Sequence, residues 1–140
     1  MAYRIPSIRK MRSLVNEVLV TEGKVWHQLG VVICSDEYLK EMNKKHLSHD
    51  YYTDILTFDY SSKATPGTGE LYISLDRVRE NAKEHSVPLA HELNRVIIHG
   101  VLHLCGYKDG NPKDKQTMSA REDFYLAHYG GGNVSTWNII

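Results

Sequence analysis

The chain has 140 residues, of which 41% are hydrophobic and 24% are charged, and this composition is typical of one globular domain with its own core. Seventeen basic residues balance seventeen acidic ones, which excludes a uniformly basic surface of the kind that draws a protein onto nucleic acid or anionic lipid. There is no apolar run of the roughly 18 to 20 residues that cross a membrane, no signal-peptide core and only two cysteines, so we expect a cytoplasmic protein with no membrane partner.

The first third of the chain predicts two helices with a strand between them. The apolar residues of segment 8–19 fall on one helical face, and Gly23 follows as a stop signal. Segment 29–34 (LGVVIC) is short, apolar and β-branched, which is typical of a buried strand. Ser35 is placed to cap a second helix that runs to about Leu47.

The middle of the chain predicts a pair of strands and a third helix. Segments 55–60 and 70–75 have strand-like patterns, and the loop 61–69 between them is rich in glycine and proline. We therefore expect the two strands to lie side by side. Asp76 is then placed to cap a helix that ends at about His85.

Two further helices complete the predicted fold. Segment 89–104 is the most apolar helix, and the last helix opens at an Asn-Pro pair and covers about 112–128. Because strands and helices alternate without a regular β-α-β rhythm, the sequence predicts an α+β fold with a small mixed sheet. We expect residues 1–130 to form a single domain and residues 131–140 to form a flexible tail.

Two histidines on the most apolar helix predict a metal site. His99 and His103 are four residues apart, so both imidazoles project from one helix face about one turn apart. Gly106 is placed to end the helix in a left-handed turn, which brings Asp109 back toward that face. The spacing resembles the metzincin signature, with aspartate in place of the third histidine. It predicts one divalent cation per chain, with Zn²⁺ favoured and Ni²⁺, Co²⁺ or Fe²⁺ also compatible.

Each of these residues also has a simpler interpretation. A histidine pair at this spacing occurs by chance on helix surfaces, and Asp109 before Gly110 is typical of an ordinary turn. The apolar surroundings favour the metal, because unliganded histidines in a core cost a few kcal/mol. Gly100 stands where His-Glu-x-x-His proteases carry their general base, so proteolysis by that mechanism is not expected. A glycine inside a helix also costs about 1 kcal/mol, which indicates a packing or access reason.

Several ordered segments resemble one known family. Residues 99–107 (HGVLHLCGY) are similar to the YbeY signature His-Gly-x-Leu-His-Leu-x-Gly-Tyr-Asp-His. Residues 42–43, 53–58 and 69–73 match, in order, the family's Asn, Thr-Asp-Val-Leu-Ser-Phe and Gly-Asp-Ile blocks. The matches run from about residue 40 to the last helix. The resemblance implies a zincin-like fold in which a small mixed sheet and several helices surround a central metal-binding helix.

The same resemblance implies a function. It indicates a cytoplasmic zinc-dependent hydrolase, a single-strand-specific endoribonuclease of small-subunit rRNA 3′-end maturation and ribosome quality control. The implied partners are single-stranded or ribosomal RNA and the ribosome or ribosome-associated proteins. Two departures stand out: Asp109 occupies the place of the family's usual third histidine, and Leu47 replaces an arginine that many members carry. Lys44, Lys45 or His46 are alternative sources of that charge, although a solvated helix face also explains them.

The residue that accepts the proton during metal-assisted phosphodiester hydrolysis is left open by the sequence. The candidates are bulk water, Asp109 and four polar side chains upstream: His46, His49, Asp50 and Asp54. Glu92 falls on the face of the ligand histidines and is a candidate partner for one of them. Two alternative functions remain. One is a ribosome-assembly factor with a structural or weakly catalytic metal, and the other is a different metal-dependent hydrolase that does not use a glutamate base.

Overall fold

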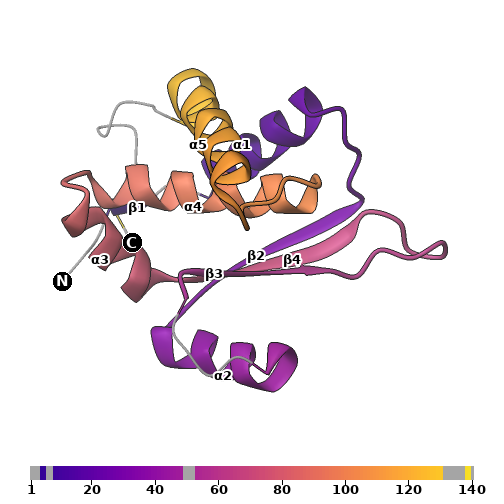
Figure 1. The fold of residues 1–140 in the computed structure, drawn as a ribbon, viewed down its shortest axis with the longest axis horizontal. Helices are drawn as coiled ribbons and strands as arrows, with labels where there is room; N and C mark the ends of the chain where they lie inside the picture. Colours follow the sequence, from indigo (N-terminus) through magenta and orange to yellow (C-terminus); the bar gives the residue numbers. More distant parts are fainter. Residues whose placement is uncertain (1–3, 6–7, 49–52, 131–137, 140) are drawn as a thin grey trace.

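A three-stranded sheet with helices on both sides organises the molecule (Figure 1). The computed structural model describes residues 4–5, 8–48, 53–130 and 138–139. In chain order the elements are β1 (Arg4–Ile5), α1 (Ile8–Thr21), β2 (Gln28–Cys34), α2 (Asp36–Leu47), β3 (Ile55–Asp59), β4 (Thr68–Ser74), α3 (Leu75–Glu84), α4 (Leu89–Leu104), α5 (Pro112–Tyr125), the π-helix η1 (Leu126–Gly130) and β5 (Asn138–Ile139).

The sheet is mixed, with strand order β2-β4-β3. Strands β3 and β4 pair antiparallel across the glycine-rich loop, as predicted, whereas β2 and β4 run parallel. Leu71 of β4 lies between Val31 of β2 and Thr57 of β3. The two strand directions and the unequal helix layers confirm the predicted α+β fold with a small mixed sheet.

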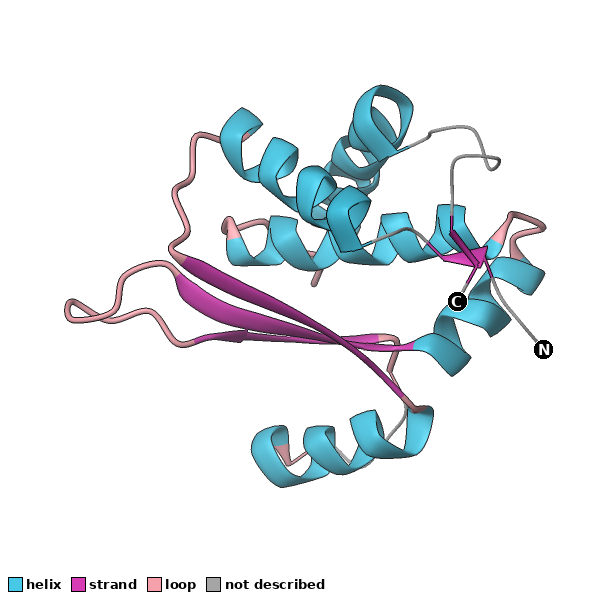
Figure 2. Cartoon of the chain, turned by 180° about the vertical axis from the view of Figure 1, so that it is seen from behind, coloured by secondary structure: helices cyan, strands magenta, loops and turns pink. Residues whose placement is uncertain are grey.

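Helix α4 is the central element of the core. It lies across one face of the sheet, and α1, α3 and α5 contact it, while α2 covers the opposite face (Figures 1 and 2). A helix that is apolar on nearly every side has to be enclosed by other elements, which is why α4 takes this place. Leu93, Ile97, Ile98 and Val101 of this helix have no exposed surface.

The N-terminal caps of α2 and α3 show where a local sequence pattern predicts the structure and where it does not. The Ser35 side chain accepts a hydrogen bond from the Tyr38 amide at 3.1 Å, so the predicted cap of α2 is confirmed. The predicted cap of α3 is wrong. Ser74 fills that position and accepts from the Arg77 amide at 3.1 Å, and Asp76 instead accepts from the Asp36 amide at 2.9 Å. Its other oxygen accepts from the Arg79 side chain of its own helix at 2.7 Å, and because the contact with α2 is non-local, no local rule identifies it.

The chain ends meet in a small second sheet. Residues 4–5 pair antiparallel with residues 138–139, a contact that the sequence does not predict. The rest of the expected tail, residues 131–137 and 140, lies outside the described residues, so its flexibility stays a prediction. Among the helices that the structure describes, none is long and apolar enough to span a bilayer. Cys34 and Cys105 are half-buried free thiols.

Candidate metal centre

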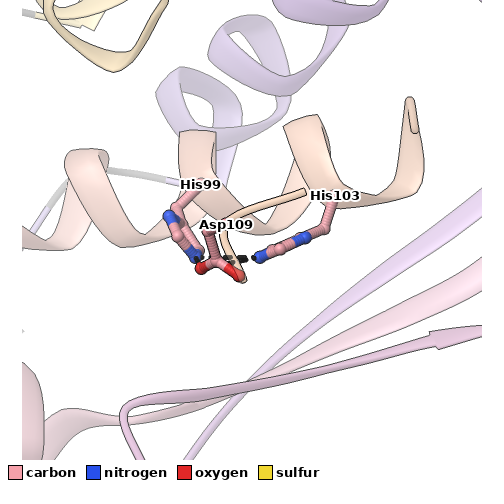
Figure 3. A group of neighbouring side chains, drawn as sticks. All are labelled: His99, His103 and Asp109. Atoms are coloured by element: carbon pink, nitrogen blue, oxygen red, sulfur yellow. Dashed lines mark hydrogen bonds and ion pairs between the residues drawn. The ribbon is translucent and has the colours of Figure 1, made fainter. Parts of the chain in front are cut away.

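His99, His103 and Asp109 converge on one point (Figure 3). The Nε2 atoms of the two histidines are 3.0 Å apart. The Asp109 Oδ2 atom lies 3.2 Å from the His99 Nε2 and 3.3 Å from the His103 Nε2. Ligand atoms about 2.0 to 2.1 Å from a tetrahedral zinc ion are themselves about 3.3 to 3.4 Å apart. The three side chains are therefore spaced as ligands of one small cation.

The end of α4 explains how Asp109 reaches the histidines. Gly106 has a φ of +106°, a left-handed conformation that glycine adopts without a steric penalty. The Tyr107 amide then donates to the Leu102 carbonyl at 3.0 Å, which closes the turn. The chain reverses direction, and three residues after Gly106 the Asp109 carboxylate faces the helix it has just left. The sequence prediction of a glycine stop that returns an acid to the histidine face agrees with this geometry.

Both histidines use their second ring nitrogen to bind an acceptor. The His99 Nδ1 donates to the Glu122 carboxylate at 2.6 Å, and the His103 Nδ1 donates to the Tyr107 carbonyl at 3.0 Å. A hydrogen on each Nδ1 leaves a lone pair on each neutral Nε2. Two lone pairs and a carboxylate facing one another repel unless a proton or a cation lies between them. The donor set therefore fits a divalent cation, and its outer partners are those that orient ligand histidines.

The charges around His99 also favour a positive charge at this position. Burial alone lowers the pKa of His99, but the hydrogen bond to Glu122 and the negative charges of Glu122, Asp109 and Asp54 outweigh it, so the pKa is raised. Glu122 is itself held by Arg95, whose Nη1 lies 2.9 Å from its second oxygen. The nearby carboxylates thus favour a cationic group at this point, either an imidazolium or a bound metal ion.

A cavity of about 430 Å³ opens in front of the three side chains. It lies between the C-terminal half of α4 and the edge strand β3, and the last residue of α2 closes one side. Its lining residues are Leu47, Thr53, Asp54, Ile55, Leu56, Thr57, His99, His103 and Asp109. The centre is consequently open to a ligand of moderate size.

Of the upstream proton-acceptor candidates that the structure describes, Asp54 lines this cavity, as Asp109 also does. Asp54 accepts a hydrogen bond from the Asn81 side chain at 3.3 Å. Burial raises the pKa of Asp54, against the opposing influence of the positive charge on His99 and of its hydrogen bonds. A carboxylate with a raised pKa holds a proton more readily near neutral pH.

The other upstream candidates are placed differently. His46 packs edge-on against Phe58, with ring centroids 5.8 Å apart, and it does not line the part of the cavity formed by described residues. His49 and Asp50 lie outside the described residues. Leu47 lines the cavity and is 42% exposed. The apolar side chain at the position of the family arginine therefore faces the site directly.

The predicted role of Glu92 is wrong. Its carboxylate is buried beside His85, with 3.6 Å between the Nδ1 and Oε1 atoms, and the partner of His99 is Glu122 on α5. Sequence reasoning missed Glu122 because it comes 23 residues after His99, with a helix break between them. A single glutamate on α5 has no spacing pattern that links it to a metal site.

Comparisons with known proteins agree on one family. The model of a family described as Endoribonuclease YbeY matches residues 4–130. A Phocaeicola vulgatus protein named Endoribonuclease YbeY is 44% identical over 126 residues, which cover 89% of this chain and 91% of that protein. A Porphyromonas gingivalis protein of the same name is 46% identical over 121 residues, or 85% and 80% of the two chains. The solution structure of TM1509 from Thermotoga maritima is similar with a TM-score of 0.64 and 30% identity, covering 89% and 81%.

Proposed function

Because this chain belongs to the endoribonuclease YbeY family, we propose that it is a zinc-dependent endoribonuclease that hydrolyses single-stranded RNA at the centre formed by His99, His103 and Asp109. The observation that carries the proposal is the convergence of two imidazole Nε2 atoms and a carboxylate within 3.3 Å at the wall of an open cavity. Neutral nitrogen donors with one carboxylate suit zinc, and they also suit Ni²⁺, Co²⁺ or Fe²⁺.

In this proposal, residues on the α4 side of the cavity hold the cation, and a residue on the β3 side accepts a proton. When bound, the cation supplies Lewis acidity, which polarises a phosphoryl oxygen and lowers the pKa of water. Glu122 and the Tyr107 carbonyl hold the two imidazoles with Nε2 toward the cavity. On the β3 side, Asp54 takes the proton of the attacking water, because burial raises its pKa toward the working range of a general base.

An exposed aromatic ring on the α2 side of the sheet supports a single-stranded substrate. Phe58 alternates with Thr57 along β3 and so points away from the cavity wall toward α2. There it packs against His46 and against the ring of Tyr60, which stacks on it at 6.1 Å with an interplanar angle of 8°. Tyr60 is 50% exposed. Unpaired RNA bases stack on such rings, whereas paired bases are unavailable to them.

The biological substrate is proposed from the family resemblance. We infer that the RNA is small-subunit ribosomal RNA near its 3′ end, and that the protein acts in the cytoplasm with the ribosome or ribosome-associated proteins. Equal numbers of basic and acidic residues support recruitment by a partner, because a neutral protein gains little affinity from the charge of RNA alone.

Cleavage of a labelled single-stranded RNA by the purified protein tests the proposal. His103→Ala should abolish both metal binding and RNA cleavage. Metal affinity should fall by more than the roughly 10- to 100-fold that is typical when a residue that only orients a ligand is lost. The circular dichroism spectrum should stay unchanged, which shows that the fold is retained. His27→Ala, which removes an exposed histidine before β2, serves as the control and should keep both metal binding and cleavage. Full cleavage and metal content in His103→Ala would refute the assignment.

A further inference from the structure

A largely buried carboxylate that is not part of the metal centre is linked to it through Tyr107 and Arg121. Glu22 follows the last residue of α1, and its side chain is only 9% exposed. Its Oε1 accepts from the Tyr107 hydroxyl at 2.8 Å, and its Oε2 accepts from Arg121 at 2.5 Å and from the Tyr125 hydroxyl. Burial alone raises the pKa of Glu22, but the three donors outweigh it and the pKa is lowered, so the carboxylate stays ionised.

Two of these three donors, Tyr107 and Arg121, are connected to the groups that bind the Nδ1 atoms of His103 and His99. The Tyr107 carbonyl accepts the hydrogen bond from the His103 Nδ1, so the residue whose ring is held by Glu22 also orients His103. Arg121 is followed in α5 by Glu122, which binds the His99 Nδ1. The carboxylate just after α1 thus holds both the turn after α4 and the residue of α5 that precedes Glu122.

The turn that carries Asp109 has little other packing to hold it. An added Cβ at Gly106 or at Gly110 would meet no atom within 4 Å, so both ends of the turn border open space. Tyr107 lies between them and is half-buried, with its hydroxyl bonded to Glu22. The Tyr107 side chain is therefore the anchor of this segment.

We propose that Glu22 is a positioning residue for the metal centre, acting through Tyr107 on His103 and on the turn that presents Asp109. The inference rests on the proposed metal site. It predicts that loosening the Glu22–Tyr107 bond weakens metal binding even when the fold is retained. The reason is that the ligands are then no longer held in one geometry before the cation arrives.

Two tyrosines offer a matched pair of variants. Tyr107→Phe and Tyr125→Phe each remove one hydroxyl that donates to Glu22, but only Tyr107 carries the carbonyl that orients His103. Affinity for Co²⁺ is measured by competition with a chromophoric chelator, the visible Co²⁺ spectrum reports ligand geometry, and urea unfolding reports stability. We expect about tenfold weaker Co²⁺ binding and an altered spectrum for Tyr107→Phe, at the low end of outer-partner effects. Tyr125→Phe should stay within twofold of the wild type.

A third variant and the wild type complete the test. Glu22→Gln removes the charge and should weaken Co²⁺ binding at least as much as Tyr107→Phe; if it does not fold, the tyrosine pair decides. Wild-type affinity and spectrum in Tyr107→Phe, or equal losses in both tyrosine variants, would overturn the positioning role while leaving the metal site intact. A wild-type protein that binds no Co²⁺ or Zn²⁺ would instead refute the proposed metal site, and the positioning role with it.

Discussion

The two histidines of α4 differ in what holds them. His103 binds a backbone carbonyl, whereas His99 binds the buried carboxylate of Glu122. A carboxylate partner makes the imidazole more basic, and Arg95 donates a hydrogen bond to the other oxygen of that carboxylate at 2.9 Å. The pKa of His99 is raised mainly by this glutamate of α5, with smaller contributions from the charges of Asp109 and Asp54.

Glu122→Gln tests this dependence in the metal-free protein. Burial lowers the pKa of His99, and Glu122 is the main influence that raises it. Removing the negative charge should therefore lower the His99 pKa, so that the ring loses its proton at a lower pH than in the wild type. NMR titration of the histidine rings measures this change, and metal affinity should fall about 10- to 100-fold.

Asp123→Asn is the control for that variant. Asp123 is adjacent in sequence and also binds Arg95, at 2.9 Å, but it is 67% exposed. Its replacement should leave the His99 titration nearly unchanged. If the two variants shift the His99 pKa equally, the effect comes from Arg95 rather than from the Glu122 hydrogen bond.

At the scale of elements, the approach of α4 to the sheet explains a glycine that helix propensity disfavours. A Cβ at Gly100 would lie 2.5 Å from the Ile55 Cδ1 and 3.0 Å from the Leu71 Cδ2. The helix thus approaches β3 and β4 more closely than any side chain at this position permits. This close packing places the histidines beside the edge strand that forms the other wall of the cavity.

Gly100→Ala should lower the free energy of unfolding by about 1 kcal/mol. Alanine gains about 1 kcal/mol of helix propensity, but overpacking costs about 1 to 3 kcal/mol, and the crowded atoms belong to Ile55 and the fully buried Leu71. Urea unfolding measures the difference. Gly110→Ala, where the added Cβ meets no atom within 4 Å, should cause no comparable loss. A more stable Gly100→Ala protein would show that the sheet relaxes readily.

At the scale of the whole molecule, local patterns predicted the elements and the convergence of His99, His103 and Asp109 better than the contacts that support them. Helix α4 follows from its apolar composition, and the β3–β4 pair from a loop with turn residues. The parallel pairing of β2 with β4 and the contacts of Glu22 and Glu122 join segments far apart in the chain. Such contacts follow from how the helices pack in three dimensions, and no periodicity in the sequence encodes them.

Metal binding should stabilise the whole fold, because the ligands and their partners come from α4, the turn after it, α5 and the residue that follows α1. A cation at 100 times its Kd contributes about 2.7 kcal/mol, or a Tm increase of roughly 8 °C for a domain of this size. Thermal unfolding with Zn²⁺ and with excess chelator measures the difference. His103→Ala should show no such increase. An equal response to Zn²⁺ in the variant and the wild type would indicate binding elsewhere.

The close packing at Gly100 also limits how this scaffold can be redesigned. In a His-Glu-x-x-His peptidase, the general base is the residue after the first histidine. Here a Cβ would crowd the ends of the Ile55 and Leu71 side chains. Installing a glutamate there would force both side chains to move and would disturb the contact between α4 and the sheet. New catalytic groups are introduced with less disturbance on the β3 wall, which makes Asp54 and its neighbours the natural positions for altering what the enzyme cleaves.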